Sequence, residues 1–432
     1  MGGAKLAGPS LCMVGVNHDT APLAVRESLS ISRGRVRGVL NRLRDFVPYG
    51  VILATCNRTE IYAAGGDCRS ASDAIVAFLR ERSGLPEEEL SPCLNVAVGY
   101  EAMRHIAETA SGLRSMIVGE WEILGQVRQA LEDAEHERMV NPPLRQLFRH
   151  AIRVGRRVRD ETDISRNALS VSSVAVDLAA RAVGDIGQRR AVLIGAGQAG
   201  KLAARAFVQR GVSRLSVVNR SHDSAEELAS SLGGAAVALD DLQSEMESAD
   251  ILISCTGAPH PIVHCDIVSD VMAKRQERPL VVVDIAVPRD VEEAVGRIEN
   301  VYLYDIDDFT QMSKANRRAR EREIAKAMSI VDEEMERFIE RWRALDVKPV
   351  VGELMRMAEE VRRRQLRLTL KKLPPLSDEE RDSLEAMTKA IVNKILHNPI
   401  RCLKNNGHGD GELVETVKDL FGIDGQEAEE RW

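Results

Sequence analysis

The chain has 432 residues, which is too long for one ordinary domain and leads us to expect three. Apolar residues make up 44% of it but aromatic residues only 3%, so its cores must be aliphatic, as in helical and α/β layers. The net charge of −7 argues against a surface that is basic throughout. Any contact with nucleic acid must therefore come from local basic patches.

Nothing in the sequence predicts a membrane protein. No apolar run reaches 18 residues, and the most apolar one, from Pro279 to Pro288, is interrupted by Asp284. The N-terminus lacks the apolar core of a signal peptide. Seven cysteines, an odd number without a C-x-x-C pair, make a disulfide framework improbable. We expect a cytoplasmic protein.

The first 160 residues alternate short strands with helices, which predicts an α+β domain over 1–160. The expected strands are LCMVGVNH, VILAT and EIYAAG, with a helix at 33–46 between the first two. Further helices are expected at 100–110, 124–137 and 143–160, the last of them starting at a Pro-Pro pair.

The next block has continuous apolar runs instead of alternating ones. These runs are RRAVLIG, RLSVVN, DILISCTG and PLVVVDIAVP. Continuous apolar strands are covered on both faces, as in a parallel sheet. We therefore predict a doubly wound, Rossmann-type nucleotide-binding domain over 161–307.

The remaining residues, 308–432, predict an all-helical domain that begins with a long connecting helix. Neither Gly nor Pro occurs between 297 and 348, and apolar residues recur there at alternating steps of four and three: Ile324, Met328, Val331, Met335, Phe338, Trp342 and Leu345. Such a heptad seam seeks a partner, either a second chain or another part of its own. We favour a homodimer. A later helix should open at the capping arrangement of Ser377 and Glu380.

A dinucleotide site is predicted where the first strand of the second block meets a helix. The turn reads G-x-G-x-x-G, in which glycines allow a tight turn and close approach of a pyrophosphate to the helix N-terminus: Gly195, Ala196, Gly197, Gln198, Ala199 and Gly200. The following strand ends at Asn219, Arg220 and Ser221, without the acidic residue that binds the ribose of NAD. Arg220 suits a 2′-phosphate, so NADPH is the expected cofactor, with Thr256 and Gly257 also at the site. The alternative is that Arg220 is a solvated loop residue.

Cys56 lies between two expected strands and should therefore be exposed on a turn. Cysteine is more often a small buried apolar residue. Here Asn57, Arg58 and Glu60 place polar groups around it, and a guanidinium beside a thiol favours the thiolate. These neighbours weaken the interpretation of Cys56 as a buried apolar residue.

Several segments together resemble, in order, the blocks of the glutamyl-tRNA reductase family. They are VNHDTAPLAVRE (16–27), ATCNRTEIY (54–62), SGLRSMIVGEWEILGQVRQA (111–130), SVSSVAVDLA (170–179), GAGQAG (195–200), DIAVPRD (284–290) and YDIDD (304–308). The resemblance covers residues 11 to about 310 and continues more loosely beyond them. One departure is the pair Trp121-Glu122, where a smaller or amide-bearing pair is expected.

The resemblance implies a reaction. Cys56 would attack the ester of glutamyl-tRNA(Glu) and form a thioester, which NADPH would reduce to glutamate-1-semialdehyde, the first committed step of tetrapyrrole synthesis. It leaves open whether an aminomutase receives this product directly.

The resemblance also implies the residues of a substrate pocket. Arg58 would bind the γ-carboxylate of the substrate, since a guanidinium matches a carboxylate bidentately. The other members of the pocket would be Thr55, Asn57, Ser115, Glu120 and Gln126. His105 aligns with a histidine that assists the chemistry, although it could equally be a histidine on the surface of a helix.

Two other readings compete, an NADP-dependent dehydrogenase of a free metabolite similar to shikimate dehydrogenase and a tRNA-binding protein with a vestigial nucleotide fold. The first leaves Cys56 without a function, and the intact glycine motif argues against the second. No metal is expected, and neither membrane nor DNA is an expected partner. A basic stripe is a candidate tRNA contact or a face paired with acids of a neighbouring domain: Arg145, Arg149, Arg153 and Arg157, with Arg156 beside it. A second basic cluster could extend it: Lys314, Arg317, Arg318, Arg320 and Arg322.

Overall fold

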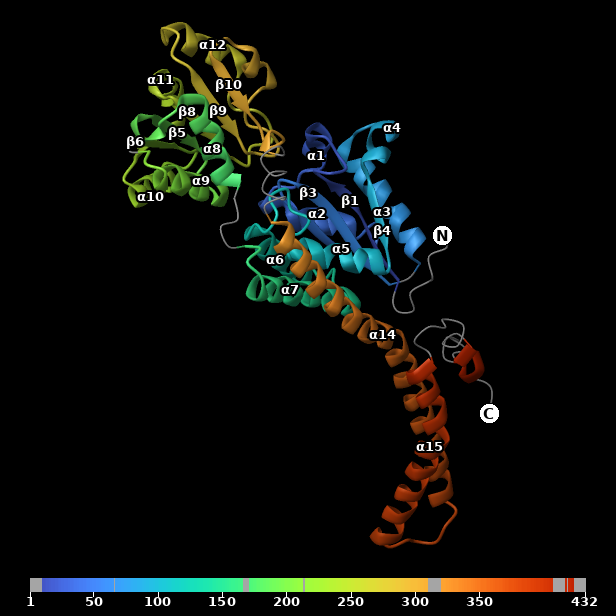
Figure 1. Cartoon of the computed structure of the whole chain (residues 1–432). Coiled ribbons are helices and arrows are strands. Elements are labelled where there is room, and N and C mark those ends of the chain that lie inside the picture. Colours follow the sequence, from blue (N-terminus) through green and yellow to red (C-terminus); the bar gives the residue numbers. More distant parts are fainter. Residues whose placement is uncertain are drawn as a thin grey trace.

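The computed structural model describes residues 10–65, 67–165, 171–212, 214–309, 320–406, 416–417 and 419–422. Figure 1 shows an N-terminal domain in the middle, a second α/β domain on one side of it, and a helical hairpin leading away on the other. None of the helices in these ranges is both long enough and apolar enough to cross a membrane.

The N-terminal domain is built on a four-stranded antiparallel sheet in the order β2-β3-β1-β4. Its strands are β1 (Leu11–Asn17), β2 (Val51–Ala54), β3 (Arg58–Ala64) and β4 (Asn95–Val98). Its longer helices are α1 (Leu23–Leu29), α2 (Val36–Leu43), α3 (Cys68–Ser83), α5 (Tyr100–Ala110), α6 (Glu122–His136) and α7 (Pro142–Glu161). Short turns of helix occur at η1 (Arg33–Arg35), α4 (Glu87–Leu90) and η2 (Ser91–Cys93).

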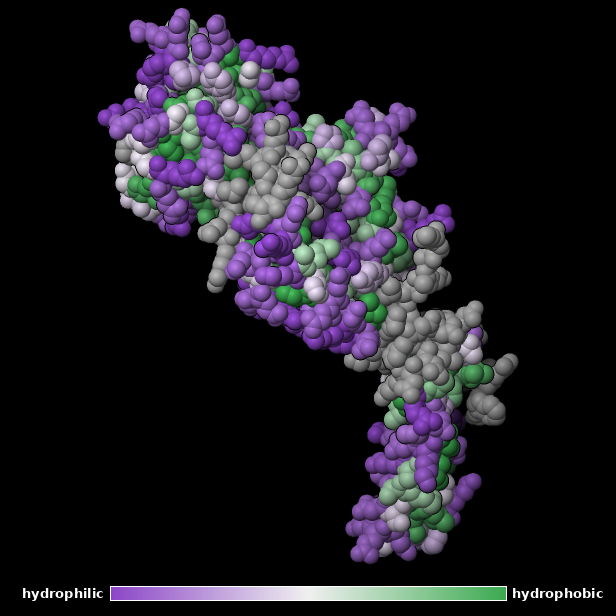
Figure 2. Space-filling view, viewed as in Figure 1, coloured by the Kyte–Doolittle hydropathy of each residue, from purple (hydrophilic) through white to green (hydrophobic). Residues whose placement is uncertain are grey.

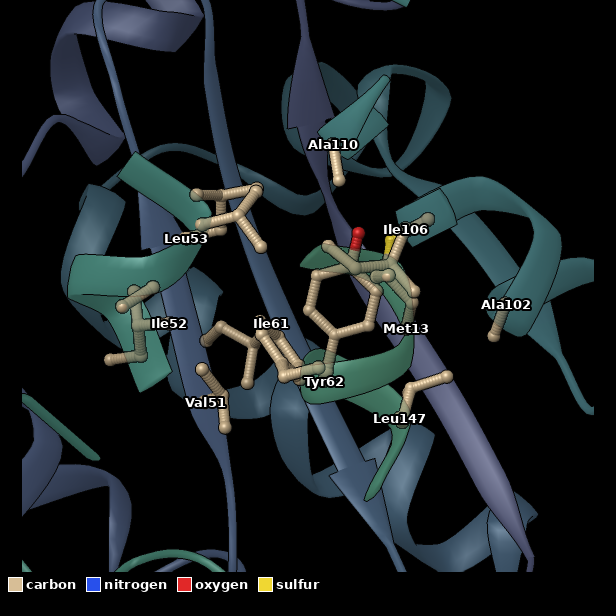
Figure 3. Close-up of a cluster of buried hydrophobic side chains, with 14 of the residues drawn as sticks. Met13, Val51, Ile52, Leu53, Ile61, Tyr62, Ala102, Ile106, Ala110 and Leu147 are labelled. Atoms are coloured by element: carbon tan, nitrogen blue, oxygen red, sulfur yellow. The ribbon is translucent and has the colours of Figure 1, made fainter. Parts of the chain in front are cut away.

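The core of this domain lies between the sheet and helices α5 and α7. Figure 3 shows Tyr62 of β3 among apolar side chains from β1, β2, α5 and α7. Its ring meets Phe148 of α7 edge to face, with centroids 5.3 Å apart. β1 and β3 are buried at every position, so tight packing on both faces of the sheet supports the strands next to the predicted nucleophile.

The second domain contains a parallel six-stranded sheet in the order β10-β9-β8-β5-β6-β7. Its strands are β5 (Arg190–Ile194), β6 (Arg214–Val218), β7 (Ala235–Val237), β8 (Ile251–Ser254), β9 (Leu280–Asp284) and β10 (Val301–Tyr304). Its helices are α8 (Val171–Val183), α9 (Gln198–Gln209), α10 (His222–Leu232), α11 (Leu242–Ser248) and α12 (Cys265–Lys274), with short turns η3 (Ile186–Gln188), η4 (Leu239–Asp241) and η5 (Glu293–Arg297). This is the predicted doubly wound order, which reverses between β5 and β8.

The two domains share apolar packing and ion pairs. Leu23, Met116 and Ile117 of the N-terminal domain belong to the same buried cluster as the core on one face of the parallel sheet. Glu27 of α1 accepts hydrogen bonds from the backbone N–H and the side chain of Arg289, at 2.7 and 3.0 Å. Arg26 pairs with Asp307.

The long helix α14 (Glu321–Leu370) leaves the N-terminal domain, and α15 (Asp378–Asn406) folds back along it. The capping arrangement predicted for α15 is present, because Ser377 N–H donates to Glu380 at 2.8 Å and Glu380 N–H donates to the Ser377 hydroxyl at 3.3 Å.

From Ile324 to Trp342 the heptad seam packs within its own chain, while the side chain of Leu345 lies outside the described residues. Met335, Phe338 and Trp342 are buried in the core of the N-terminal domain, and the Phe338 ring stacks on His150 of α7 with centroids 4.2 Å apart. The expectation that this seam forms the dimer interface is therefore wrong. The seam packs within its own chain because α5 and α7 present apolar faces to it.

Exposed apolar residues lie farther along the hairpin of α14 and α15. They are Met355, Val361, Leu368, Leu373, Met387, Ile391 and Ile395. Figure 2 shows hydrophobic residues gathered along one side of this hairpin. An apolar surface of this kind is typical of a protein interface.

Candidate active site

Cys56 lies in the middle of the three-residue turn, 55–57, that joins β2 to β3. Ala54 pairs with Thr59 across the hairpin, and Thr55 N–H donates to the Arg58 carbonyl at 2.8 Å. The chain just after β1, the neighbouring strand in the sheet, supports the turn, because His18 N–H donates to the Asn57 carbonyl at 3.0 Å. Cys56 is half-buried, and no disulfide includes it. The predicted placement of Cys56 on a turn is confirmed, but the expectation that the turn exposes it is wrong, because Cys56 packs partly buried against the core of the second domain.

The charges around Cys56 differ from those expected. Burial raises the pKa of its thiol to about 12, and the nearby carboxylates of Glu120 and Glu122 add to the rise. The cation that acts in the other direction is Arg26, whose Nη1 donates to the Cys56 carbonyl at 3.4 Å. The expectation that Arg58 favours the thiolate is not supported, because the pKa of the thiol is raised and Arg26 is the cation that lowers it most.

Arg58 instead belongs to a buried polar network beneath the turn. Its Nη1 donates to Glu60 at 2.9 Å and its Nη2 donates to the Arg114 carbonyl. His105 Nε2 lies 2.9 Å from the same Glu60 oxygen, and the Tyr62 hydroxyl donates to the other oxygen at 2.7 Å. His105 is 3% exposed, so it is not a histidine of the helix surface. Its role in the chemistry stays a prediction, as does the contact of Arg58 with substrate.

Glu60 is the centre of this network. Burial alone would raise the pKa of its carboxyl, but the charges of His105 and Arg58 hold that pKa well below its usual range. The Glu60 carboxylate therefore stays ionised near neutral pH, between the basic side chains of Arg58 and His105. It fixes the start of β3, where the turn ends.

Buried polar atoms without a partner surround the same turn. Within the described residues no hydrogen-bond partner is found for His18 Nδ1 or Asn57 Oδ1, whereas the Ser115 hydroxyl interacts with the Glu120 carboxyl. Buried polar groups are normally paired, so unpaired ones beside a nucleophile point to a polar ligand. Asn57 and Ser115 were predicted from the sequence, whereas His18 was not.

Glu120 reaches the site from the loop that precedes α6. Gly119 has a φ of +87°, and a Cβ added there would lie 2.0 Å from the Ile164 carbonyl oxygen. Only glycine fits this position. Arg159 of α7 donates to the Glu120 carbonyl at 3.0 Å, and burial raises the pKa of the Glu120 carboxyl. The loop is thus held on both sides of the residue that faces Cys56.

A cleft of about 350 Å³ opens beside this loop. Glu122 and Gln126 of α6 line it together with Ala54, two residues before Cys56. Gln198, from the glycine-rich turn of the second domain, lines it too. The predicted substrate residue Gln126 and the predicted cofactor residue Gln198 therefore share one cleft.

Replacing Glu122 with Gln should make Cys56 more reactive. Removal of a negative charge lowers the pKa of a neighbouring thiol, so the thiolate fraction at any pH below that pKa increases. We expect iodoacetamide to alkylate Cys56 roughly two- to tenfold faster at pH 8 in Glu122→Gln than in the wild type, as for a pKa shift of up to about one unit. In both proteins the rate should still be rising at pH 10. An unchanged rate would mean that Glu122 does not act on the thiol.

The glycine-rich turn has the form that a dinucleotide requires. Gly195 has a φ of +105°, and a Cβ on Gly200 would lie 2.1 Å from the Gly195 carbonyl oxygen, so α9 packs directly on the turn. At Gly197, the N-cap of α9, no described atom lies within 4 Å of an added Cβ and no side chain caps the helix. The free N–H groups and the open space fit a pyrophosphate.

The remaining cofactor residues lie at the same edge of the sheet. Asn219 accepts a hydrogen bond from Ala196 N–H at 3.3 Å, and the Ser221 hydroxyl caps α10. Arg220 is exposed, and no hydrogen bond or ion pair of its side chain is found in the described ranges. Thr256 follows β8 and is fixed by Asp290, whose carboxylate accepts from Thr256 N–H at 2.7 Å, and Gly257 comes next. The turns after β5 and β8 flank the point where the strand order reverses.

The basic stripe on α7 is largely paired with acids. Arg157 donates to Glu333 and Glu334 of α14 at 2.8 and 2.9 Å, and Arg145 donates to Glu135 at 2.6 Å. For Arg157 the structure supports the alternative of a face paired with acids of a neighbouring domain, whereas Arg145 pairs with an acid of its own domain. In the second cluster, Lys314, Arg317 and Arg318 lie outside the described residues.

Comparison with known proteins agrees with this geometry along the whole chain. Models of the "Glutamyl-tRNAGlu reductase, N-terminal domain" and "dimerisation domain" match residues 14–162 and 326–423, and a "Shikimate / quinate 5-dehydrogenase" model matches 177–312. A glutamyl-tRNA reductase of Pelotomaculum thermopropionicum is 41% identical over 419 residues, 96% of this chain and 94% of that protein. The chain belongs to the glutamyl-tRNA reductase family.

Other members of the family also match nearly the whole chain. A glutamyl-tRNA reductase of Nitratidesulfovibrio vulgaris is 38% identical over 95% of this chain and 94% of that protein. The solved glutamyl-tRNA reductase from Methanopyrus kandleri has a TM-score of 0.54 and 33% identity, and the match covers 96% of this chain and 99% of that one. Family membership disfavours the reading as a dehydrogenase of a free metabolite, because the dehydrogenase model covers the nucleotide-binding domain alone. This domain makes the protein one that uses a nicotinamide cofactor.

Arg26, like His18, is a residue of this reductase-family site that sequence reasoning missed. It is 2% exposed and lies on the buried face of α1 with Leu23 and Leu29. A charged residue three positions from apolar residues on either side of it is a signal of a buried polar contact, and it was readable in LAVRESL.

Proposed function

We propose that this protein reduces the glutamyl ester of glutamyl-tRNA(Glu) to glutamate-1-semialdehyde, with NADPH as reductant and Cys56 as nucleophile. The observation that carries the proposal is the placement of a half-buried thiol on a hydrogen-bonded turn, with unpartnered buried polar atoms of Asn57 and His18 at the same turn. Such a site fits a small polar acyl group whose carbonyl must meet the sulfur.

The chain's own residues account for the acyl transfer. The Cys56 thiol gives up its proton, and the carboxylates of Glu120 and Glu122 are the nearby groups that can accept it. The sulfur then forms a bond to the ester carbonyl carbon, the bond from this carbon to the ribose oxygen breaks, and that oxygen takes a proton as the tRNA leaves. Burial raises the pKa of Glu120 and of Glu122, which makes both carboxylates stronger bases.

Residues of the second domain would hold the cofactor. Gly195, Gly197 and Gly200 would admit the pyrophosphate, and Arg220 would bind the 2′-phosphate of NADPH. When bound, the nicotinamide supplies the hydride that reduces the thioester. The cleft shared by Gln198 and Gln126 supports an approach of the two sites to each other.

One assay tests the proposal against its rivals. NADPH oxidation is followed with glutamyl-tRNA, with free glutamate and with shikimate. We expect oxidation with glutamyl-tRNA alone. Oxidation with shikimate would establish a dehydrogenase of a free metabolite, and oxidation with none of the three would refute a reductase.

The choice of NADPH can be tested at Arg220. Because only NADPH carries a 2′-phosphate, Arg220→Ala should weaken NADPH binding roughly 10- to 100-fold, the loss typical of a charge-assisted hydrogen bond. Affinity for NADH should change less than twofold. Arg214, exposed at the opposite end of the same strand, provides the matched control, and Arg214→Ala should leave both affinities unchanged. Equal losses for both cofactors in Arg220→Ala would show that Arg220 does not read the phosphate.

We further propose a homodimer formed through the exposed apolar side of α14 and α15. The dimerisation-domain model matches this region, and its exposed residues include Ile391 and Ile395, at 49% and 66% exposure. Two copies that bury these residues against each other would remove the apolar surface seen in Figure 2 from water.

A further inference from the structure

Trp121 is the most exposed aromatic side chain among the described residues, with 64% of its surface open. Its ring is nevertheless held in place, because the indole Nε1–H donates to the Ser165 carbonyl at 3.1 Å. An indole whose polar edge is bonded and whose faces are open is a ready platform for another flat ring. Neither the catalytic chemistry nor the fold described above uses this exposed surface.

The position of Trp121 places this platform at the active site. Trp121 is followed by Glu122, which lines the same cleft as Ala54, two residues before Cys56. The loop before it cannot shift easily, since Gly119 packs on the Ile164 carbonyl and Arg159 holds the Glu120 carbonyl. The indole is thus held on the loop next to that cleft and is open to water.

We propose that the open face of Trp121 stacks on the terminal adenine of the substrate tRNA. The inference rests on the proposed function. The ester that Cys56 attacks is carried by the ribose of the 3′-terminal adenosine, so the adenine must lie within about one nucleotide of the sulfur. An exposed aromatic ring next to the cleft meets either this base or solvent. A base stacks on any aromatic face without a need for matched hydrogen bonds.

A double-mutant cycle tests the contact. Two glutamyl-tRNAs are compared, one intact and one whose terminal ribose lacks its base, with wild type and Trp121→Ala. With intact tRNA, Trp121→Ala should lower kcat/KM roughly 5- to 100-fold, the range typical of one stacked base. With the tRNA that lacks the base, wild type and variant should be equal within about twofold. Equal losses on both tRNAs, or no loss on either, would overturn the proposal.

Two controls separate stacking from a structural role. Trp121→Phe keeps a ring but loses the bond to Ser165, so it should retain most of the activity if stacking matters. Iodoacetamide should alkylate Cys56 at the same rate in wild type and Trp121→Ala. A changed alkylation rate together with an inactive Trp121→Phe would show that Trp121 only supports the loop, which would overturn the proposal.

Fluorescence makes the result independent of catalysis. Uncharged tRNA ending in adenosine should quench the emission of wild type and quench Trp121→Phe much less. If wild type fails to reduce glutamyl-tRNA but shows this quenching, the proposed function is wrong while the stacking contact stands. If wild type reduces glutamyl-tRNA but shows no difference in quenching from Trp121→Phe, the stacking contact is wrong while the function stands.

Discussion

Cys56→Ser is expected to lower the rate of glutamyl-tRNA reduction by at least about a thousandfold, because a hydroxyl is far less ionised and far less nucleophilic than a thiol. Affinity for glutamyl-tRNA should stay within about threefold, since the side chain changes by one atom. The assay is NADPH oxidation under saturating substrate, combined with a filter-binding measurement of the tRNA. In the absence of NADPH, wild type should retain radiolabelled glutamate after acid quenching, and the variant should not.

Cys402 provides the control for this experiment, because it is exposed and lies in α15, far along the chain from the site. Cys402→Ser should reduce glutamyl-tRNA at the wild-type rate. Substantial reduction by Cys56→Ser, or labelled glutamate bound to it, would rule out the thioester route.

Glu60→Ala is expected to destabilise the N-terminal domain by about 3–5 kcal/mol, the usual cost of leaving a buried charge without its partner. Arg58 is 2% exposed, and the variant would remove the only carboxylate paired with it in the described structure. Trp342 packs into the core of this domain, so its fluorescence reports unfolding in denaturant. Glu87 offers a matched control, since its pair with Arg80 is on the surface, and Glu87→Ala should barely move the midpoint.

The effect of Glu60→Ala should depend on pH with a definite sign. The folded pKa of Glu60 lies below its ordinary value of 4.5, so the carboxylate stabilises the folded domain above pH 4.5. This stabilisation is lost as the pH falls through the folded pKa. The difference in stability between wild type and variant should therefore narrow only in strong acid. A difference that already vanishes at pH 6 would contradict the paired state of Glu60.

The sequence predicts those features that follow from local pattern. The turn at Cys56 lies between two short apolar strands, and the glycine turn lies between a buried strand and a helix, so each could be placed without knowledge of the tertiary fold. The helix at Tyr100–Ala110 was predicted at its observed bounds for the same reason.

Features that depend on long-range packing could not be predicted in this way. A heptad seam looks the same whether its partner is a second chain or α5 and α7, and only the tertiary structure decides for Trp342. The prediction of the charge state of Cys56 failed for a similar reason. Arg58 is only two residues from Cys56 in sequence, but its guanidinium is paired with Glu60. The cation that contacts the turn at Cys56 is Arg26, which comes from α1.

The burial of the seam turns α14 into a rigid spacer. Its first half is fixed to the N-terminal domain by Met335, Phe338 and Trp342, while its second half carries the apolar surface proposed for dimerisation. From Trp342 to Leu370 the helix spans about 42 Å at 1.5 Å per residue. In the proposed dimer this second half of α14 would therefore set the distance between the two Cys56 thiols. Each copy could then bind its own tRNA. Inserting or deleting one helical turn after Trp342 would change the length of this half of the helix by about 5.4 Å. The two ends of the helix would keep their relative orientation to within a few tens of degrees.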